Sequence, residues 1–504
     1  MSIEQLGINY HSILPEIITA LTGVVIMLVD ALSRSRRRVF SATIALIGTT
    51  ASATAVISLW GRPVAPSFAQ MIVTDTFRLS FALIFLIVTA LTILISLSWF
   101  EEEQLASDEF FALLMFATTG MLLMSAANDL VMIFLSLEIV SITTYVLAGY
   151  RRSDPRSNES SVKYFILGSF STAFLLYGMA LIYGAVVGAK SNRALAGYAN
   201  ASATNLGFIK DAITNNAVFS IDLIYVGAAM MLIGFGFKIA SAPFHIWTPD
   251  VYQGAPTPVT AFMSAGPKAA AFAAFLRVFV ITFASTASDE LYQTWTGALL
   301  VMAVLTMTVG NIVAIVQSNI KRMLAYSSIA HAGYTLVGFI ANDISSVVFY
   351  MLTYSLMTIG SFAVVWVMAQ RGDERTEIAD YSGIGFKSFG LSIMLSVFLL
   401  SLAGIPMTAG FMGKFLVFTS AWNAGYYGLV IIGVINSAIS IYYYLRVIVV
   451  MFFREPEEGF VPPRIPYAAG VALGIAILGT FYLGLLPGRV LELIEAARNI
   501  AAIR

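Results

Sequence analysis

Residues 236–258 read GFKIASAPFHIWTPDVYQGAPTP and continue the apolar run IYVGAAMMLIGFGF of residues 224–237. The run therefore ends on a cation, Lys238, and a proline follows at Pro243. Proline has no N–H to donate and clashes with the preceding helical turn, so a helix that enters this stretch is predicted to break there. The stretch thus places a lysine beside a helix break at the end of an apolar segment.

The composition of the whole chain is typical of an integral membrane protein. Of its 504 residues, 59% are hydrophobic and 11% are charged, whereas soluble domains carry about 25% charged residues. The formal net charge is zero, so nothing indicates binding to nucleic acid. The absence of cysteine excludes disulfides, cysteine-ligated zinc and iron–sulfur clusters within this chain.

Fourteen apolar runs approach or exceed the roughly 20 residues that a membrane-spanning helix needs. They predict an all-α polytopic membrane protein. The fourth and fifth runs are separated only by AAND at 126–129, and the tenth and eleventh only by AND at 341–343, so a turn is expected at both places. The predicted spans are 12–32, 39–59, 77–99, 110–126, 128–149, 158–187, 219–249, 257–284, 291–317, 324–340, 343–369, 388–421, 425–452 and 466–486.

Basic residues predict the orientation of these spans, because loops rich in lysine and arginine stay in the cytoplasm. The basic loops all follow odd-numbered spans, so they share one face, and both termini are expected outside. The loop near 188–218 lies on the outer face by this count and is predicted to be a surface loop. The basic residues are Arg34, Arg36, Arg37, Arg38, Arg151, Arg152, Arg156, Lys321, Arg322, Arg371 and Arg375.

A second helix break is predicted in the run 388–421, which is much longer than one span needs. It contains GIPMTAG at 404–410, where proline removes a donor and glycine loosens the backbone. Lys414 comes after this break, whereas Lys238 comes before the break at Pro243. Each lysine therefore lies beside a break. Two interrupted helices, each with a lysine beside the break, indicate inverted repeats and a transport site. Carbonyl groups released by the break, and water that enters there, would lower the energetic cost of burying a lysine.

Three ionisable residues are expected at a common depth inside the membrane. Glu138, Lys238 and Lys268 each lie about 18 Å from the predicted cytoplasmic end of their helix, near the middle of a hydrocarbon layer about 30 Å thick. One explanation is a static buried ion pair between Glu138 and Lys238, but one glutamate cannot neutralise two lysines. Crowded cations in a dry site release protons readily, so the lysines are candidate proton carriers. Lys268 could instead reach toward water.

Lys163 and His331 are further candidates, each with two explanations. Lys163 opens the sixth span, where it could extend to the interface or modulate Glu138 on the preceding helix. His331 lies within the tenth span, in AYSSIAHAGYTLVGF. It could be a hydrogen-bonded core residue or a proton relay, for which an unperturbed pKa near 6.5 suits it.

Four stretches together resemble the antiporter-like membrane subunits of respiratory complex I, the NADH–quinone oxidoreductase. They are FKIASAPFHIWTPDVYQGAPTPV at 237–259, GPKAAAFAAFLRV at 266–278, KRMLAYSSIAHAGY at 321–334 and GIPMTAGFMGKF at 404–415. The resemblance covers nearly the whole chain. It is strongest to the branch called N in bacteria, or subunit 2, because Lys268 stands where sister subunits more usually carry histidine.

This resemblance implies a division of the chain and a role for each candidate. Two inverted five-helix repeats would occupy 110–284 and 285–453, with breaks in helices seven and twelve, after three helices in 1–109 and before a last helix and tail in 454–504. The implied roles are a coupling pair for Glu138 and Lys238, the central proton carrier for Lys268, the link toward the exit or the neighbouring subunit for Lys414, tuning of Glu138 for Lys163, and a place on the internal water chain for His331.

The function implied is proton translocation by a non-redox subunit in the bacterial cytoplasmic membrane. Electron transfer from NADH through FMN and iron–sulfur clusters to quinone would take place in other subunits, with no cofactor or metal in this chain. The implied partners are the sister subunit M, the small subunits K and J, and the lateral helix of subunit L. The alternative is a subunit of an Mrp-type cation/proton antiporter, against which stands the absence of an obvious carboxylate cluster for sodium. A scaffold without transport would leave the mid-depth charges unexplained.

Overall fold

The computed structural model describes residues 8–32, 38–103, 108–284, 288–369, 375–456 and 461–495. The apolar runs form helices because a backbone in lipid must satisfy its own hydrogen bonds. The long helices are α1 (Leu14–Leu32), α2 (Arg38–Leu59), α3 (Thr76–Glu103), α4 (Asp108–Ala126), α5 (Leu130–Ala148), α6 (Pro155–Val186), α8 (Ile221–Lys238), α10 (Thr257–Thr282), α11 (Asp289–Ile315), α12 (Ile320–Ile340), α13 (Ile344–Met368), α15 (Phe389–Ala403), α16 (Ala409–Asn423), α17 (Tyr427–Phe453) and α18 (Tyr467–Leu485).

Short elements connect the long helices. The only sheet in the described part of the chain is an antiparallel hairpin of β1 (Ala65–Ser67) and β2 (Ile72–Thr74). The short helices and 3-10 turns are η2 (Tyr10–Ile13), η3 (Val187–Ser191), η4 (Arg193–Tyr198), α7 (Leu206–Thr214), α9 (Trp247–Gly254), η5 (Ile378–Tyr381), α14 (Ile384–Lys387) and α19 (Gly488–Glu495).

The predicted all-α membrane-spanning fold is confirmed. Thirteen helices of the described residues are long and apolar enough to cross a membrane. The remaining predicted span, 388–421, corresponds to α15 and α16, which residues 404–408 separate. The two expected turns are also present, since α4 ends at Ala126 before α5 begins at Leu130, and α12 ends at Ile340 before α13 begins at Ile344.

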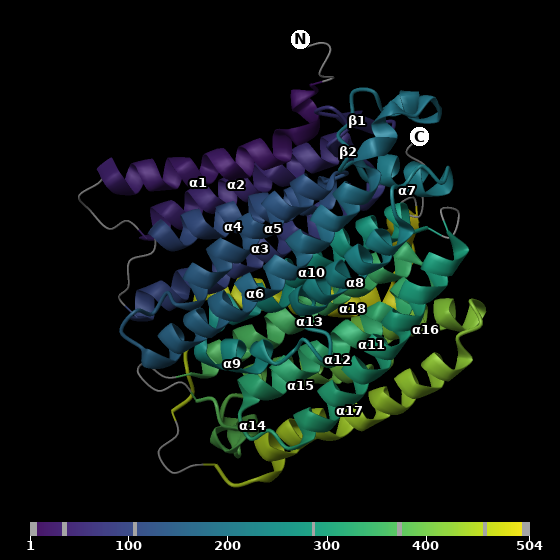
Figure 1. Cartoon of the computed structure of the whole chain (residues 1–504). Helices are drawn as coiled ribbons and strands as arrows, with labels where there is room; N and C mark the ends of the chain where they lie inside the picture. The colour runs from purple at the N-terminus through teal and green to yellow at the C-terminus, as the bar shows by residue number, and fades with distance from the viewer. Residues whose placement is uncertain are drawn as a thin grey trace.

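The helices lie side by side and alternate in direction (Figure 1). One end of the bundle, here called the hairpin end, holds β1, β2 and α7, and there Asn128 N–H donates to Met71 O over 2.8 Å. The opposite end, here called the α9 end, holds α9 and α14, and there Ile320 N–H donates to Thr376 O over 2.7 Å. Four of the predicted basic residues, Arg34, Arg36, Arg37 and Arg371, lie outside the described residues.

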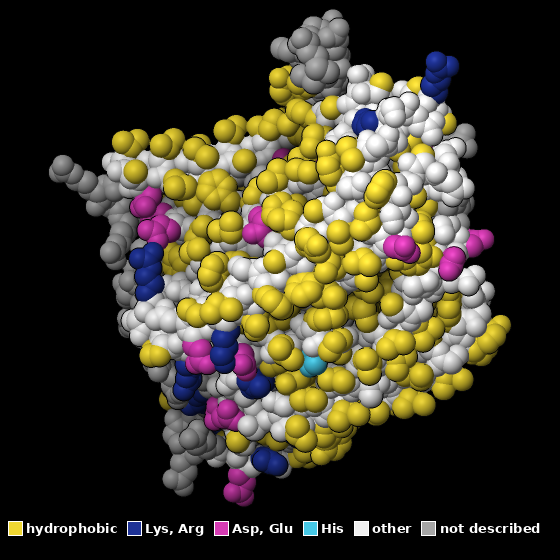
Figure 2. Space-filling view, viewed as in Figure 1, with side chains coloured by type: hydrophobic (Ala, Val, Ile, Leu, Met, Phe, Trp, Pro, Cys, Tyr) yellow, Lys and Arg dark blue, Asp and Glu magenta, His cyan; other side chains and the backbone are white. Residues whose placement is uncertain are grey.

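On the face of the molecule shown in Figure 2, the type of side chain changes along the direction of the helices. Hydrophobic side chains cover most of the middle of this face, whereas lysine, arginine, aspartate and glutamate gather mainly toward the two ends of the helices. An apolar band between charged ends is the pattern expected of a bundle embedded in lipid.

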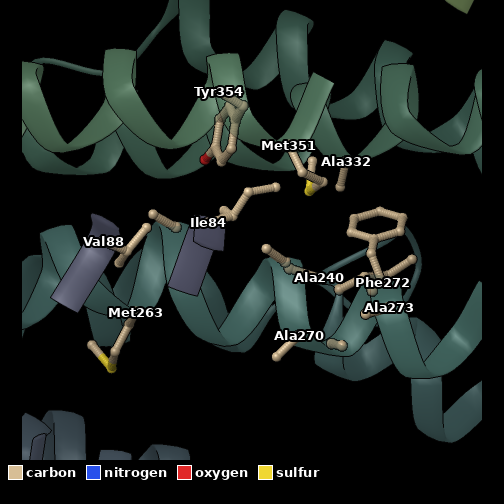
Figure 3. Close-up of a cluster of buried hydrophobic side chains, with 14 of the residues drawn as sticks. Ile84, Val88, Ala240, Met263, Ala270, Phe272, Ala273, Ala332, Met351 and Tyr354 are labelled. Atoms are coloured by element: carbon tan, nitrogen blue, oxygen red, sulfur yellow. The ribbon is translucent and has the colours of Figure 1, made fainter. Parts of the chain in front are cut away.

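The helix α10 forms the centre of the bundle, packed against α3, α4, α5, α12 and α13. Almost all of its side chains are buried, and many are alanine, which lets neighbouring helices approach closely. Figure 3 shows part of this core, in which Ile84 and Val88 of α3 lie beside α10 and Tyr354 of α13 points into the same cluster. A residue at mid-length of α10 is therefore surrounded by protein on every side.

Two buried ion pairs join the first three helices to this core near the hairpin end. The Arg277 guanidinium on α10 binds both carboxylate oxygens of Asp75, at 2.9 and 3.0 Å. Arg78 on α3 donates to the Glu16 carboxylate on α1 over 2.7 Å. None of these four side chains is more than 5% exposed. Neither pair could be predicted from local sequence patterns, because each joins residues far apart in the chain.

Both predicted breaks coincide with interruptions in the helices. The helix α8 ends at Lys238 and α9 begins only at Trp247, with Pro243 between them. The helix α15 ends at Ala403, and Gly404 follows with φ of +91°, a conformation that glycine adopts without strain. A Cβ at Gly404 would approach Lys414 Cδ to 3.0 Å, so glycine also leaves room for the lysine.

The loop predicted near 188–218 is only partly a surface loop. Residues 206–214 form α7, whose Leu206, Phe208 and Ile209 are fully buried. The side chain of Asn205 accepts a hydrogen bond from Phe208 N–H and so caps this helix. The polar residues that precede α7 favoured a loop, so the apolar residues at helical spacing within 206–214 were not recognised as a helix. At the other end of the chain, α19 packs against α3 and α13 through the buried Ile494.

Candidate functional site

Lys268 lies at mid-length of α10 and is 3% exposed. Its ammonium donates to the backbone oxygen of Ser328 on α12 over 2.9 Å, and also to the Ser328 hydroxyl. The ring of Tyr354 on α13 lies 5.9 Å from Nζ, within the range of a cation–π contact. No carboxylate within the described residues pairs with it. A buried lysine held only by neutral groups can give up its proton without leaving a counter-ion unpaired.

His331 lies one turn beyond Ser328 on α12 and is 2% exposed. Its Nδ1 is 2.7 Å from the hydroxyl of Tyr350, and its Nε2 is 3.4 Å from the hydroxyl of Tyr444. The Tyr354 ring that faces Lys268 also lies 5.2 Å from the imidazole, measured between ring centroids. The histidine is within electrostatic reach of both Lys268 and Lys414.

Lys414 on α16 is 4% exposed and reaches back across the break before it. Its ammonium donates to Ala403 O over 2.8 Å and to the Ser437 hydroxyl over 2.9 Å. Ala403 ends α15, and the last carbonyls of a helix have no partner within it. The end of α15 therefore supplies an acceptor to Lys414. The Tyr334 ring lies 4.8 Å from this ammonium.

These residues form one continuous buried row, here called the buried line: Lys268, Tyr354, His331, Tyr334 and Lys414. The Tyr354 ring centroid lies 5.9 Å from the Lys268 ammonium and 5.2 Å from the His331 ring centroid. The Tyr334 ring lies 5.6 Å from the imidazole and 4.8 Å from the Lys414 ammonium. The structure thus brings three of the six predicted site residues together and adds two tyrosines that the sequence analysis did not single out.

Lys238 and Glu138 lie on neighbouring helices but form no direct ion pair. The Lys238 ammonium donates to the hydroxyls of Ser141, over 2.9 Å, and Tyr145, over 3.4 Å. Ser141 lies one helical turn from Glu138 on α5, and the glutamate acts electrostatically on Lys238. The Glu138 Oε1 atom is buried and has no hydrogen-bond partner among the described residues. The pair is therefore close without being locked together, unlike the static ion pair considered from the sequence.

Lys163 lies at the α9 end and not against Glu138. Its ammonium pairs with Glu159 over 2.7 Å and with Asp250 of α9 over 2.8 Å. The other oxygen of Asp250 accepts from Arg322 on α12 over 2.7 Å. These side chains line a polar cavity of about 250 Å³. The Lys163 side chain is 41% exposed, which fits the first explanation, an extension to the interface. Its tuning of Glu138 stays a prediction.

Asp250 provides a prediction that depends on pH. Burial raises its pKa, but hydrogen bonds from Lys163 and Arg322 outweigh burial and hold that pKa below the usual value of 3.8. A carboxylate with a lowered pKa stabilises the fold above about pH 4 and loses this effect as pH falls further. We expect Asp250→Asn to lower the thermal unfolding midpoint of the purified complex by the same margin at pH 5 and pH 8. A margin that shrinks between those values would contradict the ionised pair.

Lys321 and Arg322 were predicted only to belong to a basic loop, but both contact the region of α9. Arg322 binds Asp250, and the neighbouring Lys321 is fully buried, with its ammonium 2.8 Å from Ala255 O. The start of α12 therefore binds the Asp250 carboxylate of α9 and the carbonyl of Ala255, the residue that follows α9. Lys321 lies next to a predicted span boundary, and that position in the sequence did not indicate that its side chain is buried.

A second cavity, of about 520 Å³, lies beside Lys414 between α15, α16 and α17. Its walls are mostly apolar, with Phe411, Phe415 and Trp422 among them, and Ser437 is one of its few polar residues. The end of the buried line at Lys414 therefore faces open space and not close-packed protein.

Comparison with known proteins agrees with this geometry. The family described as "NADH:quinone oxidoreductase/Mrp antiporter, TM" matches residues 127–440. A protein of Trichlorobacter lovleyi named NADH-quinone oxidoreductase subunit N is 46% identical over 493 residues, covering 97% of each chain. The chain belongs to the NADH-quinone oxidoreductase subunit N family. The NAD(P)H-quinone oxidoreductase subunit 2 of Rippkaea orientalis is 40% identical to it, over 90% of this chain and 84% of that one.

Solved structures extend the family assignment to the fold. A chain of respiratory complex I from Thermus thermophilus with bound aureothin superposes with a TM-score of 0.79 at 34% identity, covering 96% of this subunit N family member and 99% of that chain. A chain of the Mrp complex from Dietzia sp. superposes with a TM-score of 0.80 at 19% identity, covering 97% of each. The second likeness shows a shared fold alone. The predicted family is therefore confirmed.

Proposed function

We propose that this chain is a proton-translocating membrane subunit of an NADH–quinone oxidoreductase, and that protons cross it along the buried line. The observation that carries the proposal is the row from Lys268 through His331 to Lys414, in which each titratable group meets the next through a tyrosine ring. Membership in the subunit N family supports the assignment to this enzyme.

The chemistry of the row suits proton transfer. A lysine ammonium carries protons that it can lose when water is excluded, because a dry site disfavours the charge. A histidine between two such lysines can accept a proton from one and release it to the other. The serine and tyrosine hydroxyls around them can both donate and accept hydrogen bonds. The groups between Lys268 and Lys414 are therefore of the kinds that can pass a proton.

Glu138 and Lys238 are the proposed coupling pair. Their closeness without a direct bond supports this role. The Lys238 ammonium can bind Ser141 or move toward the Glu138 carboxylate, whose Oε1 has no hydrogen-bond partner among the described residues. A shift of the ammonium toward Glu138 would change the field at the next lysine, since charges in a low-dielectric interior interact strongly. Lys163, with Asp250, is proposed to act at the cytoplasmic mouth.

We also propose an assembly, which family membership supports. Electron transfer through FMN and iron–sulfur clusters to quinone is assigned to other subunits, and the partners are proposed to include sister subunit M, small subunits K and J and the lateral helix of subunit L. We place the α9 end, with its basic residues, in the cytoplasm of a bacterium and both termini outside. The segments 110–284 and 285–453 are proposed to be the inverted repeats.

The test is proton pumping by the complex reconstituted in liposomes and driven by NADH. Lys238→Met and Lys414→Met keep the side-chain length and remove the charge, so we expect each to reduce pumping by about tenfold or more while the complex still assembles. Native gels would report assembly, and a pH-sensitive dye would report pumping. Pumping at the original rate in both variants would overturn the proposal.

The alternative function, an Mrp-type cation/proton antiporter subunit, rests on the shared fold. The same liposomes distinguish the two, because an antiporter would exchange sodium for protons without NADH. We expect no sodium-dependent change of internal pH in the absence of NADH.

A further inference from the structure

Tyrosine hydroxyls hold His331 at both ring nitrogens, Tyr350 at Nδ1 and Tyr444 at Nε2. The Tyr444 hydroxyl also shares a short hydrogen bond with the hydroxyl of Ser327. Ser327 is the residue next to Ser328, which accepts from the Lys268 ammonium. Tyr444, Ser327 and Tyr350 are all 2% exposed or less. A chain of hydroxyls on α12 and α17 therefore ends on Nε2 of the histidine.

We propose that Tyr444 is the positioning residue that allows His331 to change its protonation state within the buried line. The proposal rests on the proposed function and adds a role for a side chain on α17, a helix that contributes no residue to the line itself. Tyr444 acts through His331 and not on the proton directly.

The physical reason is that a hydroxyl can serve both states of an imidazole. When His331 is neutral, Tyr444 donates to Nε2, while Nδ1–H donates to Tyr350. When His331 is protonated, Nε2–H donates to the Tyr444 oxygen, and the Tyr444 hydrogen turns to the Ser327 oxygen. One N–H bond forms on the imidazole as one breaks on the Lys268 ammonium, so the total charge is conserved. No buried polar group loses its partner in either state.

The surroundings of His331 make this support necessary. The titratable groups that face it are Lys268 from α10, Lys414 from α16, Tyr334 from its own helix, Tyr350 and Tyr354 from α13, and Tyr444 from α17. Two of them are cations and none is an anion, so the imidazolium relies on hydrogen bonds for its stability. Charge-assisted hydrogen bonds are stronger than neutral ones, so loss of the Tyr444 hydroxyl weakens the protonated state more than the neutral one.

The experiment compares Tyr444→Phe with Tyr381→Phe in the reconstituted complex. Tyr381 of η5 is also fully buried, but its hydroxyl donates to the backbone oxygen of Arg375 over 3.2 Å. For Tyr444→Phe we expect NADH-driven pumping near pH 7.5 to fall about tenfold and its pH profile to move about one unit toward acid. For Tyr381→Phe we expect the original profile.

Equal rates and pH profiles in the two variants would overturn the inference. The proposed function would then still stand if Lys268→Met, assayed alongside, stops pumping, and it would fail with the inference if Lys268→Met pumps normally. Where Tyr444→Phe does not assemble, Ser327→Ala carries the test, because it removes the acceptor behind Tyr444. An acid shift in that variant supports the inference, and the original profile overturns it.

Discussion

Replacing Lys268 with methionine is expected to abolish NADH-driven proton pumping. The ammonium is the only titratable group that α10 contributes to the buried line. It is held by Ser328, and no carboxylate in the described part of the chain pairs with it. Groups that transfer protons typically contribute about 10²–10⁴-fold to a rate. We expect pumping at or below about 1% of the original rate in liposomes. NADH oxidation should fall with it, because electron transfer in a tightly coupled enzyme stops when protons cannot move.

Arginine at the same position separates proton exchange from charge. Lys268→Arg keeps a cation in place, but a guanidinium does not release its proton in proteins. If Lys268 carries protons, the arginine variant should pump no better than the methionine variant. Normal pumping by Lys268→Arg would mean that a fixed charge is enough and that the line does not pass protons through this residue. Lys210→Met, on α7 at the hairpin end, serves as a control that should pump normally.

The sequence predicted the parts of the site that local patterns encode. Hydropathy located the spans, proline and glycine located the interruptions beside Lys238 and Lys414, and charge within apolar runs located Lys268 and Glu138. Each of these signals lies within about 20 residues of chain, which is the length of one span. The family resemblance supplied the roles, and these remain proposals that the experiments above test.

The contacts between helices could not be predicted in the same way. Tyr444 meets His331 across 113 residues of chain, and Lys163 meets Asp250 across 87. Such pairs depend on which helix faces which, and a buried tyrosine looks the same in sequence whether its hydroxyl meets a histidine or an asparagine. Lys163 illustrates the difficulty, because its place at the start of a span indicated an interfacial side chain but not its partner Asp250 on α9.

Replacing Arg277 with methionine is expected to cause the largest loss of stability. The substitution leaves the Asp75 carboxylate buried without its partner, and breaking a buried ion pair on one side costs about 3–5 kcal/mol. Native proteins are stable by only about 5–15 kcal/mol, so much of the margin would be lost. We expect the subunit to be depleted from membranes and the complex to assemble poorly, as measured by immunoblotting and native gels.

Two controls define the cause of that loss. Asp75→Asn in the Arg277→Met background removes the unpaired charge and keeps an oxygen for the Arg78 N–H that Asp75 Oδ1 now accepts, so it should restore part of the subunit. Arg152→Met breaks an ion pair with Glu109 in which the arginine side chain is 82% exposed, and exposed pairs contribute about 0–1 kcal/mol. Depletion no greater than in Arg152→Met would contradict the structural role of the buried pair.

The same variant also separates stability from transport. Arg277 lies nine residues after Lys268 on α10, which is about two and a half helical turns, so the two side chains leave the helix on opposite sides. Lys268 faces Ser328 of α12, whereas Arg277 faces Asp75 and the Ser125 carbonyl. We therefore expect the complexes that do assemble with Arg277→Met to pump at the original rate per complex. A lower rate per assembled complex would mean that the pair also holds α10 in the position that the buried line requires.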